Sequence, residues 1–279
     1  VRIDDYTAKI KVFVRNTWDW VTLKLKKSDA DYILRHCAMR KTLSPTLRRR
    51  GKEWFLDFGF QEKVDLSDTK ALERRIVAVN LGVNTPATIS VMQADGTILD
   101  RKFYKLSKEQ DSLLHALNRI KKAQQNHCLS TPRLWARVKG INKDISVKTA
   151  QYIVDTAVLY DAYVIVFEHL NVRGKKKGSK KQRLHHWRSQ EVQRIVTDKA
   201  HRLGIRISRI NPYGTSRYAY AGSGQVLRGK NANLSTYELC KFKSGKTYNC
   251  DLSASYNIGA RYFIREILKS LSAKAGLQV

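Results

Sequence analysis

The sequence has few cysteines, few acidic residues and no long apolar run. It contains 4 cysteines in 279 residues. We also expect no secretory start, so the chain is predicted to be a cytoplasmic protein without a disulfide scaffold. No segment approaches the roughly 18 consecutive apolar residues of a membrane-spanning helix. We therefore expect neither a secreted disulfide-rich protein nor a membrane protein.

The shortage of acidic residues leaves a strongly basic chain. Lys and Arg number 53 against 24 Asp and Glu, which gives a formal net charge of +29. This excess indicates a polyanionic partner, and nucleic acid is favoured because Lys and Arg displace counterions from phosphates. A membrane surface is the alternative, but the longest basic run does not lie on an amphipathic face.

Residues 1–72 are predicted to form a small β-rich module. Three stretches alternate apolar and polar residues as strands do, namely 8–15, 18–26 and 53–60. Ser28 is expected to cap a short helix that runs through Arg35. The polar stretch 61–74 has no periodicity and predicts a linker. Residue 1 is Val and not Met, so we expect the natural chain to extend further at its N-terminus.

Residues 73–279 are predicted to form one α/β domain. Strands are expected at 75–80, 86–93, 97–104, 162–167 and 205–210, with an Asp-Gly turn at 94–96. Helices are expected at 107–127, 133–160, 188–203 and 252–271. This order, interrupted by an irregular insert at 211–250, predicts a ribonuclease H-like (RuvC) mixed sheet with flanking helices.

Three oxygen-bearing side chains lie where this layout would bring them together. Asn80 and Glu168 end predicted strands, and Asp251 precedes the last helix. Cleavage of a phosphodiester with two Mg²⁺ ions needs converging carboxylates, because hard cations take oxygen ligands. Taken singly, Glu168 reads as a solvated loop residue and Asp251 as a helix cap. The three together predict a nuclease site.

Four segments of the chain resemble signature segments of the TnpB, or OrfB, proteins of bacterial insertion sequences, which are related to the type V CRISPR effectors. They are Val79–Asn84 (VNLGVN), Phe167–Val172 (FEHLNV), Pro212–Ser216 (PYGTS) and Asp251–Ile258 (DLSASYNI). The resemblance runs through residues 75–271 in collinear order. Residues 1–72 are similar to the tail of the family's wedge domain.

The resemblance implies an RNA-guided DNA endonuclease, often described as a transposase, with guide RNA and target DNA as partners. It also implies metal ligands at positions 80, 168 and 251. In the family the first position is Asp, and Asn80 offers one neutral carbonyl oxygen in its place. We therefore expect weakened Mg²⁺ binding and cleavage that is lost or strongly reduced. Binding of nucleic acid depends on the basic surface and should persist.

The insert at 211–250 departs from the family as well. Family members commonly carry a zinc ribbon of two Cys-x-x-Cys pairs there, whereas this chain has Cys240 near one expected ligand position and Cys250 outside the pattern. A closed structural zinc site needs four such ligands. We therefore expect no zinc, and a ribbon that is degenerate but still contacts nucleic acid.

Basic residues outside the catalytic positions are expected to bind nucleic acid. The longest cluster is Arg173–Arg183, which directly follows the strand of Glu168 and could also be only a solvated loop. The expected phosphate-binding residues are Arg48, Arg49, Arg50, Arg173, Lys175, Lys176, Lys177, Lys180, Lys181, Arg183, Arg217, Lys241, Lys243 and Lys246.

Two alternatives to a guided nuclease remain open at the level of sequence. One is a nuclease-inactive, RNA-guided DNA-binding repressor, which Asn80 favours. The other is a basic RNA-binding protein without a DNA target, in which Glu168 and Asp251 would have no catalytic role.

Overall fold

The structure is a computed structural model that describes residues 6–66, 73–128, 130–170 and 189–274. The chain divides into two compact units, Val1–Lys63 and Val64–Val279. Each unit is described by itself. In the part of the chain that the structure describes, no helix is long and apolar enough to cross a membrane.

The first unit is rich in short strands, as predicted. Its elements are β1 (Thr7–Val14), β2 (Thr17–Lys24), α1 (Lys27–Cys37), β3 (Lys41–Thr42), β4 (Thr46–Arg50), β5 (Glu53–Asp57) and β6 (Phe60–Gln61). They form three antiparallel pairs, β1–β2, β3–β6 and β4–β5. The strand predicted at 53–60 is therefore two strands that belong to different sheets.

The prediction that Ser28 caps α1 was wrong. The helix begins one residue earlier, at Lys27, and the preceding Lys26 makes no capping bond through its side chain. The Ser28 hydroxyl donates instead to Oδ1 of the neighbouring Asp29, at 3.2 Å. A serine near a helix start is therefore not always its cap, because its hydroxyl has local competitors.

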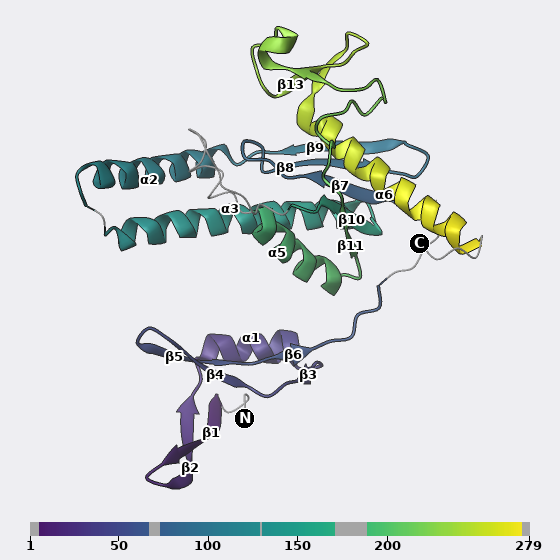
Figure 1. The fold of residues 1–279 in the computed structure, drawn as a ribbon. Helices are drawn as coiled ribbons and strands as arrows, with labels where there is room; N and C mark the ends of the chain where they lie inside the picture. The colour runs from purple at the N-terminus through teal and green to yellow at the C-terminus, as the bar shows by residue number, and fades with distance from the viewer. Residues whose placement is uncertain (1–5, 67–72, 129, 171–188, 275–279) are drawn as a thin grey trace. The chain divides into compact units, whose positions relative to one another are not determined.

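The second unit contains the main sheet and the long helices (Figure 1). Its sheet strands are β7 (Ile76–Asn80), β8 (Ala87–Met92), β9 (Ile98–Tyr104), β10 (Val164–Glu168) and β11 (Arg206–Ile210). Its helices are α2 (Ser107–Gln125), α3 (Pro132–Leu159), α5 (Ser189–Arg202) and α6 (Cys250–Lys274). These elements agree with the predicted ones to within a few residues at each end.

The sheet is mixed, in the order β11-β10-β7-β8-β9. β7, β8 and β9 form an antiparallel meander, while β10 pairs parallel to both β7 and β11. The predicted mixed sheet with flanking helices is confirmed. Because β7 and β10 are parallel neighbours, their C-terminal ends lie at the same edge of the sheet.

Each face of this sheet is covered by a different set of helices. Residues of β7 alternate between two apolar clusters: Val77 and Val79 pack with α3 and α5, while Ile76 and Ala78 pack with α6. β10 follows the same alternation, with Ile165 and Phe167 toward α3 and α5 and Val164 and Val166 toward α6. Strands buried on both faces are continuously apolar, as these are.

A glycine allows α6 to approach the sheet closely. A Cβ atom at Gly259 would lie 2.3 Å from Sδ of Met92 and 3.3 Å from Cβ of Ala78. The first distance is well inside van der Waals contact, so a larger residue would displace the side chain of Met92 or move the helix. Gly259 therefore permits the close approach between the helix that carries Asp251 and the strand that carries Asn80.

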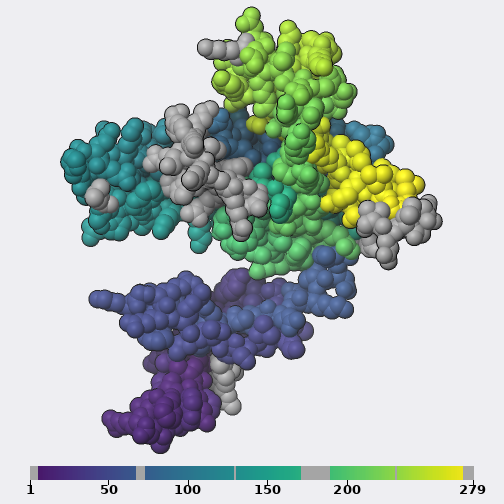
Figure 2. All heavy atoms as spheres, viewed as in Figure 1, coloured from purple at the N-terminus to yellow at the C-terminus, as the bar shows by residue number. Residues whose placement is uncertain are grey.

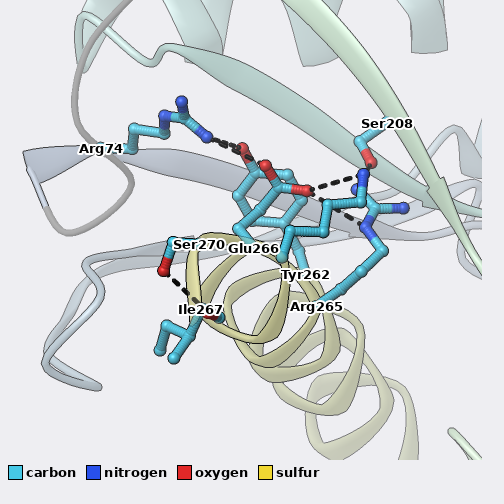
Figure 3. Close-up of polar contacts among 8 residues, drawn as sticks. Arg74, Ser208, Tyr262, Arg265, Glu266, Ile267 and Ser270 are labelled. Carbon is cyan, nitrogen blue, oxygen red and sulfur yellow. Dashed lines mark hydrogen bonds and ion pairs between the residues drawn. The ribbon is translucent and has the colours of Figure 1, made fainter. Parts of the chain in front are cut away.

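The C-terminal half of α6 is tied to the sheet by polar contacts (Figure 3). Arg74 donates from Nη1 to the Tyr262 hydroxyl at 3.1 Å and forms an ion pair with Glu266 at 3.2 Å. Arg265 donates to Ser208 Oγ in β11 at 2.6 Å. These bonds hold the axial position of α6, and with it the position of the first turn of the helix.

The insert predicted to be irregular contains a small sheet. Its strands are β12 (Leu227–Arg228), β13 (Leu239–Lys241) and β14 (Thr247–Asn249), with a 3₁₀ turn at η2 (Gly229–Ala232). Ala219, Cys240, Phe242 and Cys250 form its buried core, against which Tyr220, Val226 and Tyr248 pack. Figure 2 shows this segment as a compact lobe in light green.

Candidate functional site

Asn80 and Glu168 end neighbouring strands and face the same side of the sheet. The parallel register between β10 and β7 ends with the pair Phe167 and Val79. The next residue of each strand is Glu168 in β10 and Asn80 in β7, so these two lie side by side. Val79 and Phe167 belong to the cluster toward α3 and α5. Because side chains alternate along a strand, Asn80 and Glu168 point to the other face, toward α6.

Asp251 comes to the same place from α6. It lies in the first turn of the helix, at the second helical residue. From the sequence alone, Asp251 had a possible role as the cap of this helix. The cap is instead Asn249, whose Oδ1 accepts a hydrogen bond from the Leu252 amide at 2.9 Å. The carboxylate of Asp251 is therefore free of the capping role.

The structure brings Asn80 and Asp251 into direct contact. Nδ2 of Asn80 donates to Oδ1 of Asp251 at 3.1 Å, and its distance to the backbone carbonyl oxygen of Asp251 is 3.5 Å. Asn80 is buried, with 9% of its surface exposed. The amide thus offers a proton donor to Asp251 where an aspartate would offer a second negative charge.

Glu168 is held by a threonine that sequence analysis placed in a motif but gave no role. The Thr215 hydroxyl donates to Oε1 of Glu168. Burial raises the pKa of Glu168 above its ordinary value, while the bond from Thr215 and the positive charge of Arg261 act in the opposite direction. Burial is the largest of these effects, so the ionised form is held with few compensating partners.

Asp251 has the same electrostatic character. Burial raises its pKa above the ordinary value, against the charge of Arg228 and the hydrogen bond from Asn80, which lower it. Two partly buried carboxyls with raised pKa values at one sheet edge make this place a candidate functional site. Neither Arg228 nor Arg261 was identified from the sequence, because each reaches the site from a different element.

Strand β8, which pairs with β7, carries two buried hydroxyl groups. Thr88 in β8 pairs with Asn80 across the antiparallel ladder, and its Oγ1 has no hydrogen-bond partner within the described residues. Ser90, two residues along on the same strand face, is in the same state. Buried polar atoms are normally hydrogen-bonded, so these two hydroxyls are exceptions within the described residues.

The donor set fits a hard divalent cation in kind but lacks one charge. Glu168 and Asp251 supply carboxylate oxygens, which Mg²⁺ prefers, whereas Asn80 offers one neutral oxygen, Oδ1, while its Nδ2 donates to Asp251. No group of three or more His, Cys, Asp or Glu side chains that could hold a metal occurs in the described ranges. The set is that of a two-carboxylate site, not a three-carboxylate one.

The predicted phosphate-binding arginines of the first unit do not form one patch. Arg48, Arg49 and Arg50 follow one another on the exposed strand β4, so successive side chains point to opposite faces. Arg48 is paired with Asp57, whereas Arg49 and Arg50 lie 5.7 Å from the ring of Trp54 and 5.3 Å from that of Phe55. Within the described residues, Arg49 and Arg50 form no ion pair with a carboxylate.

The predicted phosphate-binding residues of the second unit have mixed positions. Arg217, Lys241 and Lys243 are exposed, and Lys246 donates to the Tyr220 hydroxyl at 3.0 Å while packing on the rings of Tyr220 and Tyr248. The remaining predicted residues lie outside the described residues: Arg173, Lys175, Lys176, Lys177, Lys180, Lys181 and Arg183.

Comparison with known proteins agrees with this geometry. No family model matches the chain. The chain is 27% identical over 233 residues to a TnpB-like protein of Aquifex aeolicus (strain VF5), a match that covers 77% of this chain and 76% of that protein. The predicted resemblance to TnpB is confirmed.

Solved structures support the same fold. The chain aligns with the "mini-RNA-guided endonuclease CRISPR-Cas_phi3" with a TM-score of 0.57 and 13% identity, covering 92% of this chain and 58% of that one. It aligns with Cas12f1 in a complex with sgRNA and target DNA with a TM-score of 0.50 and 17% identity, covering 76% and 54%. At such identities the likeness shows a common fold, and this chain spans a little over half the length of these structures.

Proposed function

We propose that this chain binds a guide RNA and a target DNA, and that its RuvC-like endonuclease site cleaves DNA weakly or not at all. The observation that carries the second part is the hydrogen bond of 3.1 Å from Asn80 Nδ2 to Asp251 Oδ1. A cation between two carboxylates is stabilised by both charges, and here one of them is replaced by a group that donates a proton toward the other.

The metal-binding residues in this proposal are Glu168 and Asp251, with Asn80 as a weak third ligand. When bound, Mg²⁺ would activate water and stabilise the leaving oxygen of a phosphodiester. The residues of this chain orient the two carboxylates and supply a partly buried, water-poor surface. The loss of one charge from the set weakens the cation's site, so we expect cleavage lower by several orders of magnitude than with Asp at position 80.

Guided binding is supported by the composition of the chain and by its similarity to known proteins. The chain has a formal net charge of +29 and is similar to a TnpB-like protein, and the Cas12f1 structure it resembles in fold is a complex with sgRNA and target DNA. We propose that residues 1–72 act as a wedge-like module, residues 73–279 as the RuvC-like domain, and residues 211–250 as a contact for the target. Its four free cysteines suit a reducing cytoplasm.

A nuclease-inactive repressor is the second candidate, and Asn80 favours it. The two candidates share guided binding and differ only in residual cleavage. A basic RNA-binding protein without a DNA target would neither bind DNA through its RNA nor cleave it.

Binding is tested without metal. The chain is purified with the RNA that accompanies it, the RNA is sequenced, and two DNA duplexes are made, one complementary to the RNA and one scrambled. In EDTA we expect the complex to retain the complementary duplex in a filter or gel-shift assay and to release the scrambled one. Equal binding of both duplexes would contradict guided recognition and favour the RNA-binding alternative.

A further inference from the structure

The turn after β11 carries a threonine whose hydroxyl and backbone are both engaged near the candidate site. Thr215 is almost fully buried, with 1% of its surface exposed. Its hydroxyl donates to Oε1 of Glu168 and lies 3.0 Å from the carbonyl oxygen of Pro212. A hydroxyl has one proton, and the ionised carboxylate is the stronger acceptor, so the proton goes to Glu168 when that group is charged.

This bond restrains Glu168 without using up its ability to bind a ligand. Each carboxylate oxygen has two lone pairs, so Oε1 keeps one after accepting from Thr215, and Oε2 keeps both. A single hydrogen bond to one oxygen fixes the rotation of the carboxyl group about its last bond. Within the described residues no hydrogen bond to Oε2 occurs, so this oxygen stays available to a ligand.

Thr215 is held in turn by the helix that carries Asp251. Asn257 of α6 donates from Nδ2 to the carbonyl oxygens of Thr215 at 2.7 Å and Tyr218 at 2.8 Å, which uses both of its protons. One helical turn further along α6, Arg261 donates to the Asn211 carbonyl at 2.8 Å. Thus α6 positions Asp251 directly and Glu168 through Asn257 and Thr215.

The backbone of the turn allows this arrangement only with glycine at position 214. Gly214 has φ +72°, and a Cβ there would lie 2.6 Å from a ring carbon of Tyr218. Both the left-handed conformation and the ring contact exclude larger residues. The segment Pro212–Ser216 is therefore shaped to bring one hydroxyl to one carboxylate.

We propose that Thr215 is a positioning residue that orients Glu168 for a divalent cation, with Asn257 holding Thr215 in place. The inference rests on the proposed function, since it assumes that Glu168 and Asp251 form a cation site once position 80 is Asp. It assigns a role to Thr215, whose hydrogen bonds go to Glu168, Pro212 and Asn257.

The test measures cation affinity, not activity, in the full chain carrying Asn80→Asp. Mn²⁺ is titrated and the free ion is followed by electron paramagnetic resonance. Thr215→Val keeps the shape of the side chain and removes the hydroxyl, and Thr215→Ser keeps the hydroxyl. Thr149→Val is the matched control, because Thr149 is equally buried and its hydroxyl bonds only to the backbone of its own helix, at Ile145.

We expect Thr215→Val to weaken Mn²⁺ binding about tenfold or more, as loss of an outer partner of a metal ligand does. Thr215→Ser should restore affinity to within about threefold of the background, and Thr149→Val should leave it unchanged. Thermal denaturation of each variant without Mn²⁺ reports any general loss of stability. If Thr215→Val does not fold, Thr215→Ala, which adds no methyl group facing Glu168, takes its place.

Unchanged Mn²⁺ affinity in Thr215→Val, or equal weakening in Thr215→Ser, would overturn the positioning role while leaving the proposed function intact. Absence of Mn²⁺ binding in Asn80→Asp itself would overturn both the positioning role and the proposed endonuclease site, since no cation site would then exist for Thr215 to support. The two failures are thus distinguishable in one titration series.

Discussion

At the scale of single residues, position 80 decides the character of the site. The amide of Asn80 and the carboxylate of Asp251 satisfy each other at 3.1 Å, so the two elements that carry them are joined without a cation. An aspartate at position 80 would bring two carboxylates together, and like charges at such separations stay ionised only if a cation neutralises them. We therefore propose that Asn80 gives up metal affinity in exchange for this metal-free contact.

A stability measurement follows from this exchange. Asn80→Asp should lower the stability of the metal-free protein by about 1–2 kcal/mol, through the lost hydrogen bond and the new repulsion. Mg²⁺ should restore it, because a ligand that binds only the folded state raises the melting temperature. Thermal denaturation with and without Mg²⁺ checks this, and the unaltered chain serves as the control that we expect to respond much less.

The three candidate positions could be proposed from the sequence because Asn80 and Glu168 end predicted strands and Asp251 lies at the start of a predicted helix. Asn80, Glu168 and Asp251 are recognisable from their apolar flanks, which predict where strands end. Thr215, Arg228 and Arg261 were missed, because each reaches Glu168 or Asp251 from a loop, from a two-residue strand or from a later turn of a helix. No periodicity in the sequence encodes such approaches.

At the scale of elements, the segment 211–250 shows where pattern reasoning fails. Strands of two or three residues, such as β12, β13 and β14, are too short to show the alternation of apolar and polar residues. The segment was therefore predicted to be irregular. Its core consists of aromatic rings and two thiols, and the rings of Tyr220 and Phe242 meet edge to face at 5.6 Å. The lobe has an apolar centre of its own.

We predict that this lobe is stabilised by its aromatic core and needs no zinc. A closed structural zinc site takes four ligands, and the described residues contain no group of three or more His, Cys, Asp or Glu side chains that could hold a metal. Phe242→Ala should cost about 3 kcal/mol or more, and Leu227→Ala, an exposed position in the same sheet, less than about 0.5 kcal/mol.

Hydrogen exchange over residues 219–249, before and after treatment with a chelator, checks both parts. We expect the Phe242 variant to lose protection and the chelator to have no effect. One equivalent of zinc in the purified chain, together with loss of protection on chelation, would show that a metal and not the aromatic core holds this lobe.

At the scale of the whole molecule, the charge of +29 should govern affinity for nucleic acid. Binding is expected to fall steeply with salt, because each phosphate contact releases counterions. Among the described residues, Arg49 of β4 has no carboxylate partner and lies against the ring of Trp54, whereas Arg48 is paired with Asp57. Arg49→Gln should therefore reduce the slope of log affinity against log salt by about one, and Arg48→Gln should change it less.

Titrations of RNA at several salt concentrations measure these slopes, with the two variants as a matched pair on adjacent positions of one strand. An affinity that barely changes between low and moderate salt would contradict the phosphate-contact account altogether. Equal slopes for the two variants would contradict only the distinction between a paired and an unpaired arginine.

The central claim concerns what one amide does to a RuvC-like site, and plasmid cleavage tests it most directly. The unaltered chain and Asn80→Asp, each with its copurified RNA, are incubated with Mg²⁺ and a supercoiled plasmid that carries the matching sequence. We predict that the plasmid stays supercoiled with the unaltered chain and is nicked or linearised by Asn80→Asp. Cleavage by the unaltered chain at the rate of the Asn80→Asp variant would contradict the account.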